Sequence, residues 1–389
     1  MHVLIAGVSC RAAAESAARA GFEVTAIDAF GDLDQHPSVQ VLSVPRDFET
    51  PFSAAAAARA ARSIESDAVM YLSSFENHPK AVGSIGSGRK LWGNPPSVLQ
   101  RVRDPFEVAR ALRKRGHAVP SIRVTPARTG RWLLKPVLSG GGRGVRVWQP
   151  GRRVPRGCYL QEFVEGTPGS IVFVAARGRA VPIGVSRQLV GEDAFGAAGF
   201  QYCGNILAAA GDAQFARDRA LVRRAAELAG AIAEEFGLVG VNGIDFVARD
   251  GVPYAIEVNP RWTASMELVE RAYGLSVFRA HAAACINGVL PASGDFDLGR
   301  ARRGVQAFGK AIVFARHDVI VGNTRDWIAS GVRDVPHPRE KIAAGRPVCT
   351  VLATGRDALD CHAALVERAG HMYADLATPS LRVKLRAIS

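Results

Sequence analysis

The stretch that most constrains this chain is residues 241–263, VNGIDFVARDGVPYAIEVNPRWT. Two short apolar runs flank residues 249–251, Arg-Asp-Gly, which is typical of a β-hairpin. Glu257 and Asn259 are two residues apart, so they share a face of their strand. A two-residue Asp-Gly loop would put Asp245 of the partner strand on the opposite face. A three-residue Arg-Asp-Gly loop would put it on the same face as Glu257.

If these polar side chains do share a face, the hairpin presents two carboxylates and an amide oxygen to one point. Such an oxygen-only set suits Mg²⁺, or Mn²⁺ in its place, because Mg²⁺ binds one or two carboxylates and completes its shell with water and phosphate. We therefore predict Asp245, Glu257 and Asn259 as metal ligands. Arg261 follows at once, and a guanidinium beside a metal neutralises a phosphoryl group in transfer. The alternative is a surface hairpin with solvated acids.

Composition and charge limit the classes of protein to which this chain can belong. It has no apolar run of about 18 residues, so no transmembrane helix is expected. It starts with a strand pattern instead of a signal peptide, and its six cysteines lack metal or redox spacing, so we expect a cytoplasmic protein with reduced thiols. The net charge of +13 permits nucleic-acid binding. However, the basic residues do not alternate with aromatics, which favours anionic small molecules or an Arg-rich composition over a nucleic-acid groove.

Residues 1–94 alternate strand and helix patterns, which predicts βαβ units on a parallel, Rossmann-like sheet. Ligands of such sheets bind at the carboxyl ends of the strands. Arg11, Glu76 and Asn77 lie there and are predicted to contact substrate. A plain helix N-terminal turn is the alternative for Glu76 and Asn77.

Residues 95–165 begin with two basic helices and continue as an antiparallel unit in which a strand, RWLLKPV, carries Lys135. A lysine in an apolar strand needs an anionic partner. A glycine-rich loop follows, and its backbone N–H groups can approach phosphate closely. The predicted phosphate-binding residues of this loop are Ser139, Gly140, Gly141, Gly142 and Gly144. An ordinary glycine-rich hairpin is the alternative.

Residues 166–295 are predicted to form a second α+β unit containing the metal hairpin, and residues 296–389 a C-terminal α+β cap. Polar side chains at the end of one strand and in the next loop are predicted to contact substrate, namely Arg187, Gln188, Tyr202 and Asn205. Arginine among them suits an anionic carboxylate. A homodimer is a common prior for soluble enzymes, and we expect one here if the chain is an enzyme.

The order of these pieces resembles the ATP-grasp superfamily, and most closely its biotin-carboxylase-related carboligases, or carboxylate–amine ligases. The lysine strand with its glycine flap, the segment QEFVEG and the Asp-to-Glu-Val-Asn-Pro-Arg strand pair occur in family order. The resemblance implies an ATP-grasp fold with two α+β subdomains enclosing ATP. It implies that Lys135 contacts phosphate, that Glu162, Phe163 and Val164 hold adenine, and that Ser170 lies near the ribose.

The resemblance also implies a reaction. A carboxylate would attack the γ-phosphate to give an acyl phosphate, and an amine would then displace phosphate, with Arg187 stabilising the tetrahedral intermediate. The family's second lysine is missing, because Pro105 stands where it would be, and Arg101 or Arg103 is the predicted substitute. The alternatives are a bicarbonate-activating carboxylase, a non-catalytic ATP-binding protein and, more remotely, a nucleic-acid-binding protein.

Overall fold

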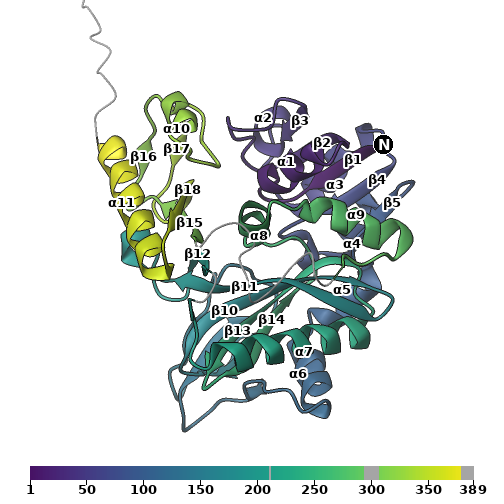
Figure 1. Cartoon of the computed structure of the whole chain (residues 1–389), viewed down its shortest axis with the longest axis vertical. Helices are drawn as coiled ribbons and strands as arrows, with labels where there is room; N and C mark the ends of the chain where they lie inside the picture. Colours follow the sequence, from purple (N-terminus) through teal and green to yellow (C-terminus); the bar gives the residue numbers. More distant parts are fainter. Residues whose placement is uncertain (210–211, 293–305, 378–389) are drawn as a thin grey trace, which may run out of the picture.

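The computed structural model describes residues 1–209, 212–292 and 306–377. Its N-terminal region is a parallel sheet of strand order β3-β2-β1-β4-β5, as the alternating pattern predicts (Figure 1). The strands are β1 (His2–Ala6), β2 (Glu23–Asp28), β3 (Val39–Ser43), β4 (Ala68–Tyr71) and β5 (Lys90–Trp92). The helices are α1 (Arg11–Arg19), α2 (Val44–Asp47), α3 (Ala54–Ala60) and α4 (Pro79–Ile85). Sequence reasoning missed β3, a short edge strand that is only partly buried.

Two helices, α5 (Pro96–Val102) and α6 (Pro105–Lys114), lead into a small antiparallel sheet of order β6-β9-β7-β8. Asp104 caps α6, since its carboxylate accepts the backbone N–H groups of Phe106 and Glu107. Proline at the first helical position needs no N–H partner, which explains the Asp-Pro pair. The strands are β6 (Ile122–Arg123), β7 (Trp132–Pro136), β8 (Arg146–Val147) and β9 (Cys158–Glu162).

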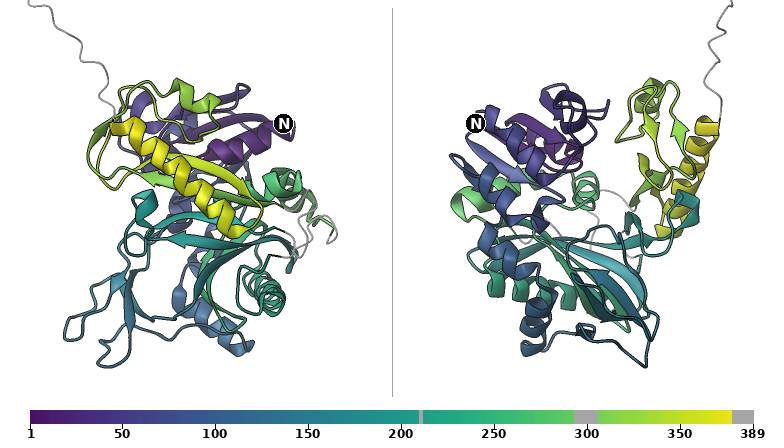
Figure 2. Two further views of the ribbon diagram at one scale, coloured as in Figure 1. Left: turned by 60° about the vertical axis from the view of Figure 1, so that its left-hand side comes forward. Right: turned by 180° about the vertical axis from the view of Figure 1, so that it is seen from behind.

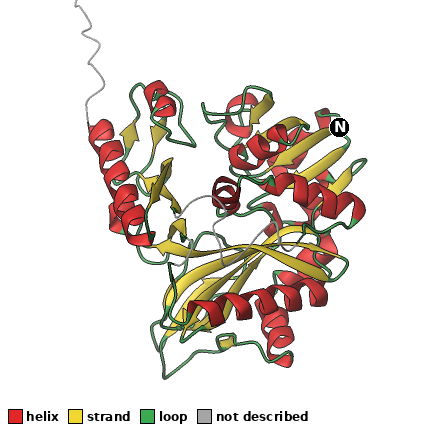
Figure 3. Ribbon diagram, viewed as in Figure 1, coloured by secondary structure: helices red, strands yellow, loops and turns green. Residues whose placement is uncertain are grey.

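The large subdomain is a seven-stranded antiparallel sheet of order β14-β13-β10-β11-β12-β15-β18. Figure 3 shows its long strands in yellow, with helices in red beside them. Its strands are β10 (Thr167–Ala176), β11 (Arg179–Val190), β12 (Tyr202–Leu207), β13 (Gly240–Arg249), β14 (Val252–Asn259), β15 (Ala307–Phe314) and β18 (Pro347–Gly355). The last two come from the predicted cap, so that region extends this sheet. The predicted boundary at 295/296 lies outside the described residues.

Helices cover both faces of the large sheet. Alternate residues of β10 face two cores: Ile171 and Phe173 pack under α7 (Asp218–Phe236), whereas Val172 and Val174 face α8 (Met266–Tyr273) and α9 (Val277–Asn287). Helices α8 and α9 lie between the sheet and the N-terminal region (Figure 2). The cap adds β16 (Val319–Ile320), β17 (Lys341–Ile342), α10 (Arg325–Ala329) and α11 (Ala358–Ala377). Within the described ranges, no helix is long and apolar enough to cross a bilayer.

The buried His281 on α9 leads to a prediction about pH. Its Nδ1 accepts the Val241 N–H at 3.0 Å, and burial lowers the pKa of the ring to about 4. In the unfolded chain the His281 ring has its ordinary pKa near 6.5. Between pH 6.5 and 4 the ring is therefore protonated in the unfolded state and neutral in the folded state. We expect this stabilisation, roughly 3 kcal/mol for a shift of this size, to be present above pH 6.5 and lost as the pH falls toward 4.

Thermal unfolding of wild type and His281→Asn from pH 4 to 7.5 measures this, because Asn supplies an acceptor oxygen without the titration. The wild type should lose more stability on acidification than the variant. His317 is exposed, so His317→Asn should follow the wild-type profile. Parallel profiles for wild type and His281→Asn would contradict the assignment.

Candidate active site

The β13–β14 hairpin has the two-residue Asp250-Gly251 loop, with φ of +53° and +74° and with Arg249 paired to Val252. By itself this loop would place Asp245 and Glu257 on opposite faces. The register shifts by one residue between Asp245 and Phe246, so that Glu257 stands directly across from Asp245. A β-bulge thus reverses the effect of the short loop and brings the two carboxylates to one face.

The three predicted metal ligands lie next to one another, and their side-chain oxygen atoms are the kind of ligand that Mg²⁺ prefers. Asn259 and Gln188 donate hydrogen bonds to the two carboxylate oxygens of Asp245, each at 2.9 Å. Burial, with the neighbouring Glu257 charge, raises the pKa of Asp245 to about 6. A buried carboxylate beside a second carboxylate is unfavourable in its ionised form, and a nearby cation would stabilise that form. The donor set therefore fits a divalent cation bound by two carboxylates.

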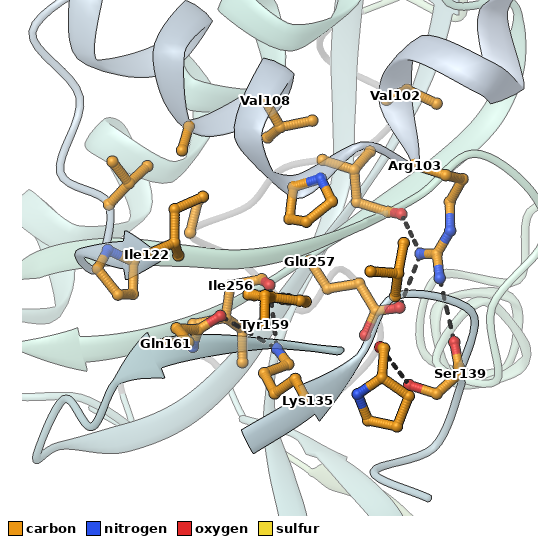
Figure 4. Close-up of a pocket in the computed structure, with 18 residues that line it drawn as sticks. Val102, Arg103, Val108, Ile122, Lys135, Ser139, Tyr159, Gln161, Ile256 and Glu257 are labelled. Atoms are coloured by element: carbon orange, nitrogen blue, oxygen red, sulfur yellow. Dashed lines mark hydrogen bonds and ion pairs between the residues drawn. The ribbon is translucent and has the colours of Figure 1, made fainter. Parts of the chain in front are cut away.

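Arg103, and not Arg101, is the arginine at this site (Figure 4). Its guanidinium donates to Glu257 Oε1 at 2.7 Å, to Asn77 Oδ1 at 2.9 Å and to the Ser139 carbonyl at 3.1 Å. Burial alone would raise the pKa of Glu257, but Arg103 and Lys135 hold it below its usual value. Arg101 is 47% exposed and pairs with Glu107 on the surface.

Lys135 on β7 points from the small sheet toward the metal hairpin (Figure 4). Its ammonium donates to Gln161 Oε1 at 3.2 Å and to the carbonyl of Ile256, the bulged residue of β14, at 3.3 Å. Burial lowers the pKa of Lys135, although Glu257 and Asp245 oppose the shift. The oxygens that Lys135 contacts are thus neutral, and the carboxylates Glu257 and Asp245 act on it through their charge without a direct ion pair.

A cavity of about 920 Å³ lies between the N-terminal region, the small sheet and the large sheet. It gathers most of the predicted side chains: Arg11, Glu76, Asn77, Lys135, Ser139, Gly140, Gly141, Gly142, Phe163, Val164, Ser170, Gln188, Tyr202, Asn205, Asp245, Glu257, Asn259 and Arg261. Glu76 fixes the position of Arg261, because the Arg261 Nε–H donates a hydrogen bond to Glu76 Oε1 at 2.7 Å. Ser170 pairs with Asp245 across β10 and β13, so it lies at the metal end of the cavity.

Three predicted residues do not line the cavity. Arg187 and Gln188 are consecutive on β11, so they face opposite sides, and it is Gln188 that faces the cavity. The side chain of Glu162 accepts a hydrogen bond from the Ser121 N–H and does not line the cavity. Gly144 does not line the cavity, although its neighbours Arg143 and Val145 do.

Arg11 lines the cavity, but its charge is already paired. Its guanidinium is 1% exposed and binds Asp334 at 2.8 Å and Glu267 at 3.1 Å, with Asp34 at 3.4 Å. The predicted capture of a free substrate carboxylate by Arg11 would have to compete with these three carboxylates. The residue is therefore better explained as a clamp between α1, α8 and the cap.

Sequence reasoning missed two charged groups of the cap that line the same cavity, Lys310 and Asp334. Lys310 is buried and donates to Glu267 at 2.7 Å, while Asp334 is one quarter exposed. Lys310 interrupts an apolar strand, GVQAFGKAIVFA, as Lys135 does, so the same signal could have found it. Asp334 lies in a loop whose sequence carries no comparable signal.

The glycine flap touches the large subdomain at one point that leads to a prediction. Gly141 accepts the Tyr202 N–H at 3.1 Å, and a Cβ on Gly142 would lie 1.8 Å from the Phe200 carbonyl oxygen. Gly142 also has φ of +76°. If the chain turns over ATP as the resemblance implies, we expect Gly142→Ala to prevent this docking and to lower that turnover by about a hundredfold, the cost of misplacing reacting groups by about 1 Å.

Gly140→Ala is the matched control, because a Cβ there would meet nothing within 4 Å. Steady-state kinetics and thermal unfolding of both variants separate an effect on the flap from an effect on folding. Equal turnover in the two variants would show that docking on Phe200 is not required.

Known proteins resemble this chain in one domain and in overall fold. An ATP-grasp domain model matches residues 102–265. A curated relative, an uncharacterized protein of Methanocaldococcus jannaschii, is 22% identical over 67% of this chain, and the match spans only 63% of that relative.

Solved structures share the fold at low identity. A Campylobacter jejuni biotin carboxylase, in complex with β-γ-ATP, has a TM-score of 0.69 at 15% identity, covering 93% of this chain and 89% of that one. An L-amino acid ligase of Bacillus licheniformis has 0.68 at 17%, covering 95% and 97%. N5-carboxyaminoimidazole ribonucleotide synthetase of Thermotoga maritima has 0.61 at 17%, covering 96% and 97%. Residues 102–265 therefore match an ATP-grasp domain, and the chain has the ATP-grasp fold.

Proposed function

We propose that this protein is an ATP- and Mg²⁺-dependent ligase that activates a carboxylate as an acyl phosphate and joins it to an amine. The observation that carries the proposal is the bulged hairpin, which sets Asp245, Glu257 and Arg261 on one wall of the cavity. Lys135 and the glycine flap of the small sheet form another part of the wall. Positive groups and metal ligands at one place are what phosphoryl transfer requires.

The chain's own residues would divide the work as follows. Lys135 and the flap N–H groups hold the phosphates, while Phe163 and Val164 line the region proposed for adenine. Bound Mg²⁺, held by Asp245, Glu257 and Asn259, would neutralise phosphate charge. Arg261, fixed by Glu76, stabilises charge on the γ-phosphoryl group as a carboxylate oxygen bonds to phosphorus and the bond to ADP breaks.

The second step would take place toward the cap. The amine nitrogen bonds to the acyl carbon, the bond to phosphate oxygen breaks, and the amine loses a proton. Lys310 has N–H donors beyond the one bound to Glu267 and faces the cavity, so it is our proposed anchor for the carboxylate substrate. Arg187 has no part in this scheme, because it lies on the other face of β11. Flap closure excludes water that would hydrolyse the acyl phosphate.

Thermal unfolding with and without MgATP tests the nucleotide site. Ligand at about a hundred times its dissociation constant adds roughly 2.7 kcal/mol of stability. We expect a Mg²⁺-dependent rise in wild type that Glu257→Ala loses, and that the exposed control Glu227→Ala keeps. No rise with any nucleotide would remove the basis of the proposal.

Phosphate release with pairs of acids and amines then tests the reaction itself. Release that needs both an acid and an amine supports the ligase. Release with bicarbonate and no amine would favour the alternative, a bicarbonate-activating carboxylase. A protein that binds MgATP and releases no phosphate with any pair would correspond to the non-catalytic alternative.

A further inference from the structure

The positive charge of this protein is concentrated in one segment. Residues 108–161 contain 13 Lys and Arg residues and no Asp or Glu. The whole chain has 49 basic and 36 acidic residues, so everything outside this segment carries 36 of each and is balanced. The net charge of +13 therefore belongs to the end of α6 and the small sheet, and a generally Arg-rich composition does not explain it.

Nearly all of this charge faces solvent. Lys135 is buried, and the other twelve basic residues of the segment are exposed. Two of them pair with carboxylates from elsewhere, Arg115 with Glu234 and Glu235, and Arg131 with Glu165. Across the described part of the chain, Arg152, Arg153 and Arg156 have no carboxylate partner.

The same segment contains the glycine flap, which lines the cavity. Of its basic residues, Lys135 and Arg143 line the cavity and the others lie outside it. The outer charges would act on an approaching nucleotide through their field, which extends over about 10 Å at 0.1 M salt. In contrast, the metal end of the cavity presents Asp245 and Glu257, which by themselves repel an approaching polyphosphate.

We propose that the small subdomain is an electrostatic capture surface that raises the association rate of nucleoside triphosphate with the cavity. The inference rests on the proposed nucleotide site. A field of one sign around a cleft raises the association rate of an oppositely charged ligand by about 10–1000-fold, and the gain falls steeply with ionic strength. The dissociation rate depends on contacts inside the cavity and should not change when outer charges are altered.

Stopped-flow binding of the fluorescent nucleotide N-methylanthraniloyl-ATP with Mg²⁺ tests the proposal at several salt concentrations. The variant is Arg152→Glu/Arg153→Glu/Arg156→Glu, which changes exposed residues away from the cavity lining. The control Arg59→Glu/Arg62→Glu/Arg325→Glu makes the same charge change on exposed residues of the balanced part. A third variant, Arg152→Ala/Arg153→Ala/Arg156→Ala, changes the net charge by half as much as the first.

At low salt we expect the first variant to bind about tenfold more slowly than wild type, the control to change less, and the alanine version to lie between. The dissociation rates should agree, and the association rates should converge at high salt. Equal association rates for variant and wild type at low salt would overturn the capture surface and leave the nucleotide site standing. Failure of wild type to bind the probe at all would overturn the proposed function itself.

The most direct competitor is a nucleic acid held by the same arginines. If the first variant loses a salt-dependent gel shift of random DNA while its nucleotide association rate is unchanged, the surface serves a nucleic acid and the proposal is overturned.

Discussion

Arg261→Ala is expected to lower the rate of the proposed ATP-dependent ligation by about 10³–10⁵-fold, the usual contribution of an arginine that stabilises a transferring phosphoryl group. Its guanidinium is anchored by Glu76 Oε1 at 2.7 Å and by Asn259 Oδ1 at 3.1 Å, so it is already in place before the transition state forms. The loss should appear in kcat more than in nucleotide affinity, because the charge it stabilises develops in the transition state.

Arg261→Lys should recover little activity, since an ammonium cannot make the same paired contacts. Glu76→Gln keeps Arg261 and loosens its anchor, so a smaller loss, about 10–100-fold, is expected. The exposed Arg223→Ala serves as control. Single-turnover measurements of acyl phosphate formation distinguish these cases, and a normal kcat in Arg261→Ala would move the chemistry to another residue.

Arg11→Met is expected to destabilise the fold by about 3–5 kcal/mol, the cost of leaving buried charges without their partner. Arg11 is 1% exposed and faces Glu267, Asp334 and Asp34, which come from three different parts of the chain. Methionine fills similar space but removes the guanidinium from all three carboxylates. Glu267 keeps Lys310 and Arg271, whereas Asp34 and Asp334 lose the cation that they bind. The contacts that join the N-terminal region to the cap should therefore loosen first.

Thermal and urea unfolding measure this effect, with Arg223→Met as the matched control. Arg223 is 67% exposed and pairs with Glu227 one turn away, so its loss should cost about 0.3–0.5 kcal/mol. Glu267→Gln should also destabilise, because Arg11 and Lys310 both depend on it. A cost below about 1 kcal/mol for Arg11→Met would mean that the network does not hold these elements together.

The main parts of the site could be predicted from the sequence because they are local patterns with few alternative roles. A buried lysine in a strand, a glycine-rich flap and closely spaced acids before an arginine meet in one cavity, as expected. These signals are local, since they depend on strand alternation and backbone freedom over a few residues. The parallel sheet of the N-terminal region was predicted for the same reason.

Other features depended on register. The Asp-Gly loop alone indicates opposite faces for Asp245 and Glu257, and only the bulge at Ile256 brings them together. Register also decided between Arg187 and Gln188, because neighbours on a strand cannot face the same side. The bulged residue, Ile256, is an ordinary strand residue, so the local sequence does not indicate that it lacks a partner on β13.

By itself, then, the sequence determined which chemical groups this protein has and in what order, and it placed the net charge in residues 108–161. Only the tertiary structure decided how the charges are matched. Arg11 became a clamp because Glu267 and Asp334, more than 250 residues away along the chain, lie against it. Arg103 took the place beside Glu257 for the same reason. Pairings over such distances follow from the packing of whole sheets and helices, which no local pattern records.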